Sequence, residues 1–189
     1  VSIREGKRPD GSVIGPPMAI EFYHGMSDRD AKAIVAYMRT VTPVKNATPK
    51  SVYRIPLHAQ KPPGHVADIS PSDKVRYGDY LVRIGHCMEC HTPLVRGRPV
   101  ADMVGSGGRS FKGPWGNAIS ANITPDKETG IGNWTDAQIK RAIQKGKRHD
   151  GAGLRPPMCY RCYDKMNDGD LDAVIASLRA MKPIKKNRR

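Results

Sequence analysis

The sequence contains few aromatic residues. They make up 6% of its 189 residues, with two Phe and two Trp, while hydrophobic residues in total reach only 38%. A chain of this kind has little material for a core built from protein alone, and a bound prosthetic group that adds apolar bulk would explain the shortage. The scarcity of aromatics also argues against a nucleic-acid-binding module, in which bases stack on aromatic rings.

Long hydrophobic runs are absent as well. No stretch approaches the roughly 18 apolar residues that a membrane-spanning helix needs, so we expect no transmembrane segment in this chain. The sequence begins at Val1 without a Met, a basic n-region or an apolar h-region, which favours a mature or trimmed product.

Acidic residues are in the minority. The chain has 32 Lys and Arg against 18 Asp and Glu, a formal net charge of +14. Such an excess favours an acidic partner, whether nucleic acid, an anionic membrane or an acidic face on another protein, although a solvated basic surface is the simpler alternative. Five of the basic residues cluster along one stretch and form a candidate docking patch: Lys140, Arg141, Lys145, Lys147 and Arg148.

An internal repeat organises the chain. Residues 1–45 align without a gap to residues 141–185, and both copies contain the tripeptide Pro-Pro-Met. In each copy an N-cap residue, Ser27 or Asn167, is followed by acidic residues, which predicts the start of a helix.

The repeat implies one complete domain and one partial domain. Residues 72–189 predict a helix, a cysteine motif, a Gly-rich loop, a helix, the Pro-Pro-Met loop and a last helix. Residues 1–45 hold only the back half of this plan, so we expect the front half of a first domain to be missing from the chain. Residues 46–71 are rich in proline and are predicted to be a linker.

The cysteine motif indicates a covalently bound haem. Residues 87–91 are Cys-Met-Glu-Cys-His, the C-x-x-C-H pattern of haem c attachment. Two thiols at this spacing can form thioethers to the two vinyl groups along one porphyrin edge, and the adjacent histidine then lies beneath the iron. We therefore expect one haem c, bound by Cys87 and Cys90 with His91 as an axial ligand.

A methionine is the candidate for the sixth ligand, because a thioether favours the high potential of an electron carrier. Of eight Met residues, Met158 is the best candidate, since Pro156 and Pro157 stiffen the backbone before it and the loop lies between two predicted helices. Trp115 and Asn122 are further candidates for the haem pocket. Core packing for Trp115 and a turn role for Asn122 are the alternatives.

Three segments of the sequence resemble a known family. Residues 85–93 (GHCMECHTP), 111–143 (FKGPWGNAISANITPDKETGIGNWTDAQIKRAI) and 154–158 (LRPPM) are similar to class I cytochrome c, and more narrowly to the multihaem (diheme or triheme) cytochrome c subunits of alcohol and gluconate dehydrogenases.

The resemblance implies an all-α cytochrome c fold, with helices around a covalent haem, preceded by the C-terminal half of a second repeat. It also implies His91 and Met158 as axial ligands, and Met18 as the ligand of a first haem only if the missing half-domain is supplied.

We therefore expect an electron carrier rather than an enzyme, located in the periplasm or at the outer face of the cytoplasmic membrane. Its partner would be a dehydrogenase subunit or a terminal acceptor with an acidic face, and not a nucleic acid. The alternative of a peroxidase-type haem enzyme requires an open sixth coordination site, which a Met158 ligand would close.

A second C-x-x-C sequence, Cys159 and Cys162, leaves several interpretations open. A zinc site made of these residues with Cys87 and Cys90 is one, but it leaves His91 and the repeat unexplained. A local disulfide and two free thiols are the others.

Overall fold

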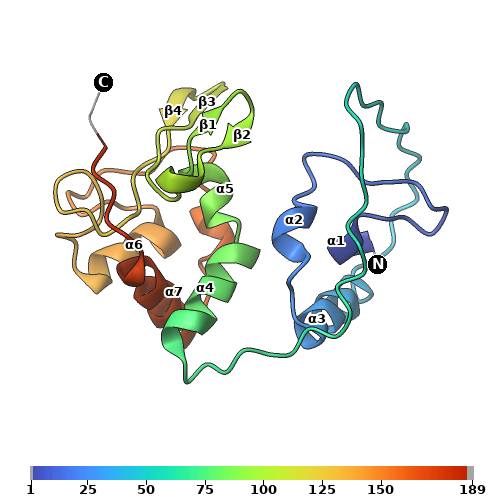
Figure 1. Cartoon of the computed structure of the whole chain (residues 1–189), viewed down its shortest axis with the longest axis horizontal. Coiled ribbons are helices and arrows are strands. Elements are labelled where there is room, and N and C mark those ends of the chain that lie inside the picture. The colour runs from blue at the N-terminus through green and yellow to red at the C-terminus, as the bar shows by residue number, and fades with distance from the viewer. Residues whose placement is uncertain (1, 187–189) are drawn as a thin grey trace. The chain divides into compact units, whose positions relative to one another are not determined.

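The chain folds as two compact units, Val1–Ile69 and Ser70–Arg189. The computed structural model describes residues 2–186 (Figure 1). The first unit contains the helices α1 (Ser2–Glu5), α2 (Ile20–Tyr23) and α3 (Asp28–Met38). The second contains α4 (Lys74–Ile84), α5 (Cys87–His91), α6 (Asp136–Lys145) and α7 (Asp168–Ala180), with the 3-10 helices η1 (Ala101–Met103) and η2 (Tyr160–Cys162). None of the helices described is long and apolar enough to span a membrane.

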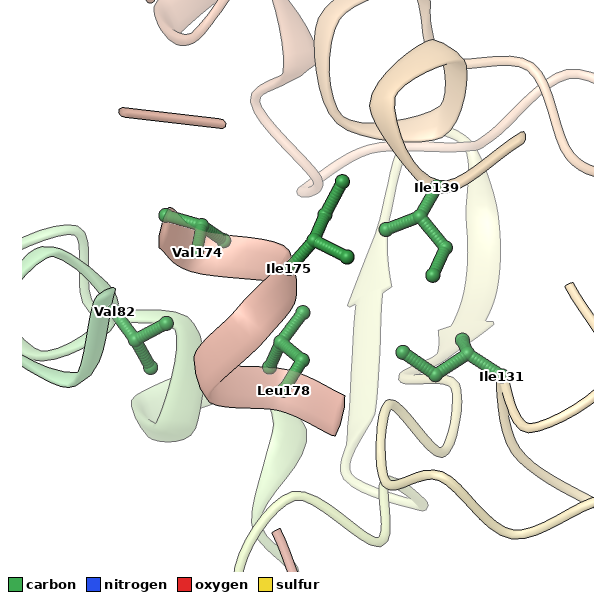
Figure 2. Packing of buried hydrophobic residues seen from close by; sticks show 6 residues of the cluster. All are labelled: Val82, Ile131, Ile139, Val174, Ile175 and Leu178. Atoms are coloured by element: carbon green, nitrogen blue, oxygen red, sulfur yellow. The ribbon is translucent and has the colours of Figure 1, made fainter. Parts of the chain in front are cut away.

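The core of the second unit surrounds α7. Apolar residues recur along this helix at three- and four-residue spacing, which places them on one face. Figure 2 shows α7 with Val82 of α4 on one side and Ile131 and Ile139 on the other. The buried cluster consists of Val82, Ile131, Ile139, Val174, Ile175 and Leu178.

Helix α4 crosses α7 at close range. A Cβ atom at Gly78 would overlap the Ala173 carbonyl group, so only glycine allows the two backbones to approach in this way. The crossing sets the direction of α4, and α4 leads directly into the cysteine motif.

The helices begin where their capping residues predict. In α6 the Thr135 side chain accepts a hydrogen bond from the Gln138 amide, and the Gln138 side chain accepts one from the Thr135 amide, a complete capping box. Asn167 caps α7 by accepting a bond from the Asp170 amide. Gly146, with a φ of 61°, ends α6 in the left-handed conformation.

The expectation of an all-α fold is wrong. The described residues are 35% helical and 9% strand. One antiparallel hairpin pairs β1 (Leu94–Val95) with β2 (Arg98–Pro99), and a second pairs β3 (Ser110–Gly113) with β4 (Gly116–Ile119). Both lie in the segment that was predicted to be loop. The first hairpin turns at Arg96 and Gly97, whose φ values of 50° and 77° are the paired positive values of a type I′ turn.

Residues 46–69 belong to the first unit in this structure. The Gln60 amide donates to the Glu5 carbonyl at 2.9 Å, and the Asp28 amide donates to the Val66 carbonyl at 3.0 Å. The Asp28 carboxylate also lies 2.7 Å from His65 Nδ1.

The two repeats share a local backbone structure. In each, a left-handed glycine accepts a 2.7 Å hydrogen bond at its carbonyl from the residue eight positions later: Gly6 from Ile14, and Gly146 from Leu154. The Pro-Pro-Met tripeptide follows each of these turns.

Candidate haem site

The C-x-x-C-H motif forms the single-turn helix α5. Residues three apart on a helix lie on the same face, so Cys87 and Cys90 are neighbours there and His91 follows directly. His86, in the left-handed conformation with a φ of 58°, separates α5 from the end of α4 at Gly85. The helix therefore presents two thiols and an imidazole as one group.

The His91 ring is oriented as a metal ligand requires. Its Nδ1 lies 2.7 Å from the Ala121 carbonyl oxygen, which can only accept, so Nδ1 carries the proton. The lone pair then resides on Nε2, where it could bind a metal, and the backbone carbonyl fixes both tautomer and ring orientation. Burial lowers the pKa of His91, although the bond to Ala121 acts in the opposite direction. The lowered pKa favours the neutral imidazole, which is the form that coordinates a metal.

The Gly-rich loop after α5 holds the helix in place. The Gly107 amide donates to the His91 carbonyl at 2.7 Å, and the Arg109 guanidinium donates to the Glu89 carbonyl at 2.6 Å. These carbonyls are at the end of a helix, where intrahelical donors are lacking. The loop thus supplies hydrogen-bond donors to the backbone carbonyls of α5 and limits the movement of this helix.

The two thiols of α5 are not activated. Burial raises the pKa of Cys87 to about 11, and burial followed by the nearby Glu89 carboxylate raises the pKa of Cys90. Catalytic and redox-active cysteines have lowered pKa values. The site therefore lacks the electrostatics of a thioredoxin-like centre, whereas its neutral imidazole beside two cysteines on one helical turn fits haem c attachment.

Met158 lies in the loop between α6 and η2 and is partly buried. Its amide donates to the Arg155 carbonyl at 3.3 Å, and Pro157 before it is exposed. Met88, Met166 and Met181, by contrast, pack against the hydrophobic core. Because Met158 does not belong to that core set, its side chain remains a candidate ligand.

Cys159 and Cys162 form a disulfide with a Cα–Cα distance of 5.4 Å. Neither sulfur is then a thiolate, as a four-cysteine zinc site would require. Within residues 2–186, no group of three or more His, Cys, Asp or Glu side chains is arranged to hold a metal ion.

Tyr163 is a site residue that sequence reasoning missed. Its hydroxyl donates to the Gly85 carbonyl at 2.7 Å, two residues before Cys87. The only signal in the sequence was that tyrosine occupies the same position, Tyr23, in the first repeat.

The structure places the two remaining pocket candidates differently. Trp115 lies at the β3–β4 turn, and its side chain is 39% exposed. Asn122 is buried, and its amide nitrogen donates to Thr129 Oγ1 at 2.9 Å and to the Ile184 carbonyl at 2.7 Å. Its oxygen accepts a bond from the Thr124 amide. These bonds occupy the amide hydrogens of Asn122, so the side chain has none left to donate to a haem. The contacts therefore favour the role of Asn122 as a turn residue.

The basic cluster is only partly available to a partner. Lys140 forms a 2.7 Å ion pair with Asp172 of α7, and Arg148 lies 3.4 Å from Asp150. Lys145 and Lys147 are exposed. The free positive charge is therefore concentrated at the end of α6 and the turn after it.

No protein-family model matches the chain. Several curated proteins are similar to it, including the following three. The cytochrome c subunit of the quinone alcohol dehydrogenase of Gluconobacter oxydans is 40% identical over 111 residues, 58% of this chain and 22% of that protein. The fructose dehydrogenase cytochrome subunit of Gluconobacter japonicus is 39% identical over 108 residues, 57% of this chain and 21% of that protein. A diheme cytochrome c-type protein of Cereibacter sphaeroides is 30% identical over 107 residues, 56% of this chain and 36% of that protein.

The matched segment spans only about a fifth of the first two relatives and about a third of the diheme protein. It nevertheless covers more than half of this chain. Over that part of its length, the chain is homologous to the cytochrome c subunits of alcohol, fructose and gluconate dehydrogenases and to a diheme cytochrome c.

Proposed function

We propose that this chain is an electron-transfer cytochrome c that carries one haem, bound by thioethers to Cys87 and Cys90, with His91 and Met158 as axial ligands. The observation that carries the proposal is the imidazole of His91, held by the Ala121 carbonyl at 2.7 Å so that Nε2 bears the lone pair. The homology to cytochrome c subunits of dehydrogenases supports it.

A bound haem supplies a one-electron couple at its iron. The residues of this chain would hold the His91 ligand and the attachment helix of that haem. Ala121 holds the His91 ring, and Gly107 and Arg109 hold the backbone of α5. Ligands held from several sides move little when charge changes, which suits an electron carrier better than a catalyst. A thioether from Met158 would also close the sixth position to peroxide.

We place this function in the periplasm, with a dehydrogenase subunit or a terminal acceptor as redox partner. The Cys159–Cys162 disulfide supports the location, because such bonds persist in oxidising compartments. Residues 1–45 would be the C-terminal half of a first cytochrome c domain, joined by residues 46–71 to the complete domain over residues 72–189. Met18, which is 38% exposed, would be the ligand of a first haem only if the missing half-domain is supplied.

Replacing the sixth ligand tests the proposal. We expect Met158→Ala to leave the haem attached, to abolish the methionine-to-iron charge-transfer band of the ferric protein, and to lower the potential by on the order of a hundred millivolts. Met103→Ala, which removes another methionine of the unit, is the matched control and should keep both properties. A charge-transfer band that survives in Met158→Ala would assign the sixth ligand to another residue.

A further inference from the structure

The two repeats differ directly after their shared methionine. The second repeat has Cys159 and Cys162, joined in a disulfide, where the first has Ala19 and Phe22. The residue that follows is a tyrosine in both. The disulfide is therefore a feature that the second repeat has in addition to the common loop, next to its candidate iron ligand.

The disulfide closes a short ring that begins at the residue after Met158. Within this ring the Cys162 amide also donates to the Cys159 carbonyl at 2.9 Å, which completes the single turn of η2. A cross-link between residues three positions apart removes backbone freedom that a loop otherwise retains. The C-terminal side of Met158 is thus fixed, as the prolines fix its N-terminal side.

Tyr163 ties this ring to the haem-attachment segment. Its hydroxyl donates to the Gly85 carbonyl at 2.7 Å. A Cβ atom at Gly85 would lie 3.8 Å from both the Cys87 sulfur and a ring carbon of Tyr163, so the ring and the sulfur approach the same point. The Met158 loop and the end of α4, two residues before Cys87, are therefore linked by a side chain from one to the backbone of the other.

We propose that the Cys159–Cys162 disulfide and Tyr163 form a brace that positions Met158 for ligation, by fixing its loop to the segment that carries Cys87. These are positioning residues, since they would act on the ligation through Met158. The proposal rests on the function given above, and it assigns to the disulfide a role in holding the sixth ligand.

Competition for the sixth site measures the brace directly. Imidazole added to the ferric holoprotein displaces a methionine ligand, so its apparent affinity rises when that ligand is held less firmly. One neutral hydrogen bond contributes about 0.5–1.5 kcal/mol to the stability of the brace, so Tyr163→Phe should bind imidazole roughly twofold to tenfold more tightly than the parent. The double variant Cys159→Ala/Cys162→Phe, which installs the residues of the first repeat, should show a gain of about tenfold or more.

Tyr160→Phe is the matched control. The ring of Tyr160 packs on Gly146, and among the residues described its hydroxyl has no hydrogen-bond partner. This variant should bind imidazole as the parent does. Equal gains in Tyr160→Phe and Tyr163→Phe would overturn the brace, because the Gly85 bond would then not be the cause.

A chemical test avoids any folding defect in the variants. Both cysteines are exposed, so a phosphine reaches the disulfide of the folded holoprotein and reduces it to two thiols, with oxidation of the phosphine to its oxide. Alkylation with iodoacetamide should then add two groups by mass, and ferricyanide returns the iron to the ferric state. We expect the alkylated protein to bind imidazole about tenfold more tightly than the untreated one.

The outcomes separate the two proposals. A parent protein without the methionine-to-iron band would overturn both the ligation by Met158 and the brace. A parent with that band, whose imidazole affinity is unchanged by Tyr163→Phe and by reduction and alkylation, would overturn the brace and leave the proposed function standing.

Discussion

Helices α3 and α7 occupy equivalent positions in the two repeats, yet their surroundings differ. Both begin at a capped residue, Ser27 or Asn167, whose side chain accepts a bond from the amide three positions on. In α7 Leu178 is 4% exposed, whereas its counterpart in α3, Met38, is 61% exposed. Local capping therefore suffices to start a helix, while burial depends on what packs against it.

The partner of α7 explains the difference. Helix α4 crosses it at Gly78, and α6 contributes Ile139 to the same core. In the described part of the first unit, α3 contains no buried residue. The comparison indicates that the first repeat forms its local structure without the hydrophobic core that stabilises the second.

The largest expected effect is on stability at the two equivalent positions. Leu178→Ala should lower the free energy of unfolding by about 2–5 kcal/mol, because it leaves a cavity in the core. Met38→Ala, its matched control, should change it by less than about 0.5 kcal/mol. Urea denaturation followed by circular dichroism measures both. Similar losses in the two variants would show that α3 is packed as tightly as α7.

A smaller effect concerns acid stability of the first unit. Hydrogen bonds from His65 and then Arg4 lower the pKa of Asp28 to about 2. A carboxylate whose pKa is lowered by folding stabilises the folded state above its unfolded pKa, about 3.9, and this contribution is lost as the pH falls through the folded value. Asp28→Asn should therefore weaken the first unit at neutral pH and flatten its loss of stability between about pH 4 and pH 2.

The equivalent residue of the second repeat provides the control. The Asp168 side chain is 88% exposed and lies 3.6 Å from Lys140. Amide hydrogen exchange, read separately for residues 1–69 and 70–189, should respond to Asp28→Asn and hardly to Asp168→Asn. Identical acid profiles for the parent and Asp28→Asn would show that the bonds of Asp28 to His65 and Arg4 do not contribute to the acid stability of the first unit.

The smallest expected effect is on partner association. Lys145 and Lys147 are exposed, and the first repeat has Glu5 and Lys7 at the same positions. The double variant Lys145→Glu/Lys147→Glu should slow electron exchange with an acidic partner at low salt. The difference should fade above about 0.1 M ionic strength, where the Debye length is about 10 Å.

Stopped-flow measurement of the electron-exchange rate across a salt series tests this electrostatic attraction between the lysines and the partner. Lys7→Glu is the control from the first repeat and should leave the rate unchanged. A rate that is the same for the parent and the double variant at every salt concentration would make the cluster an ordinary solvated surface.

Local signals in the sequence predicted the local structure well. The N-caps at Ser27 and Asn167 are confirmed. Each depends on residues within one helical turn, so a linear pattern contains the necessary information.

Features that depend on contacts between distant residues were not predictable in this way. The strands are two to four residues long, too short for alternation to distinguish them from loop, and the all-α expectation was therefore wrong. The bond from Tyr163 to Gly85 joins residues 78 positions apart and has no pattern in the sequence. The exposure of α3 likewise cannot be predicted from the apolar residues of this helix, because it depends on which other helices pack against it.

Haem stoichiometry tests the central claim most directly. Only residues 87–91 have the C-x-x-C-H sequence, so the holoprotein should contain one haem per 189-residue chain. A pyridine haemochrome assay should give that ratio, acid–acetone extraction should not remove the haem, and its mass should remain on the proteolytic peptide that contains Cys87 and Cys90. Two haems per chain, or a haem that acid–acetone removes, would contradict the account.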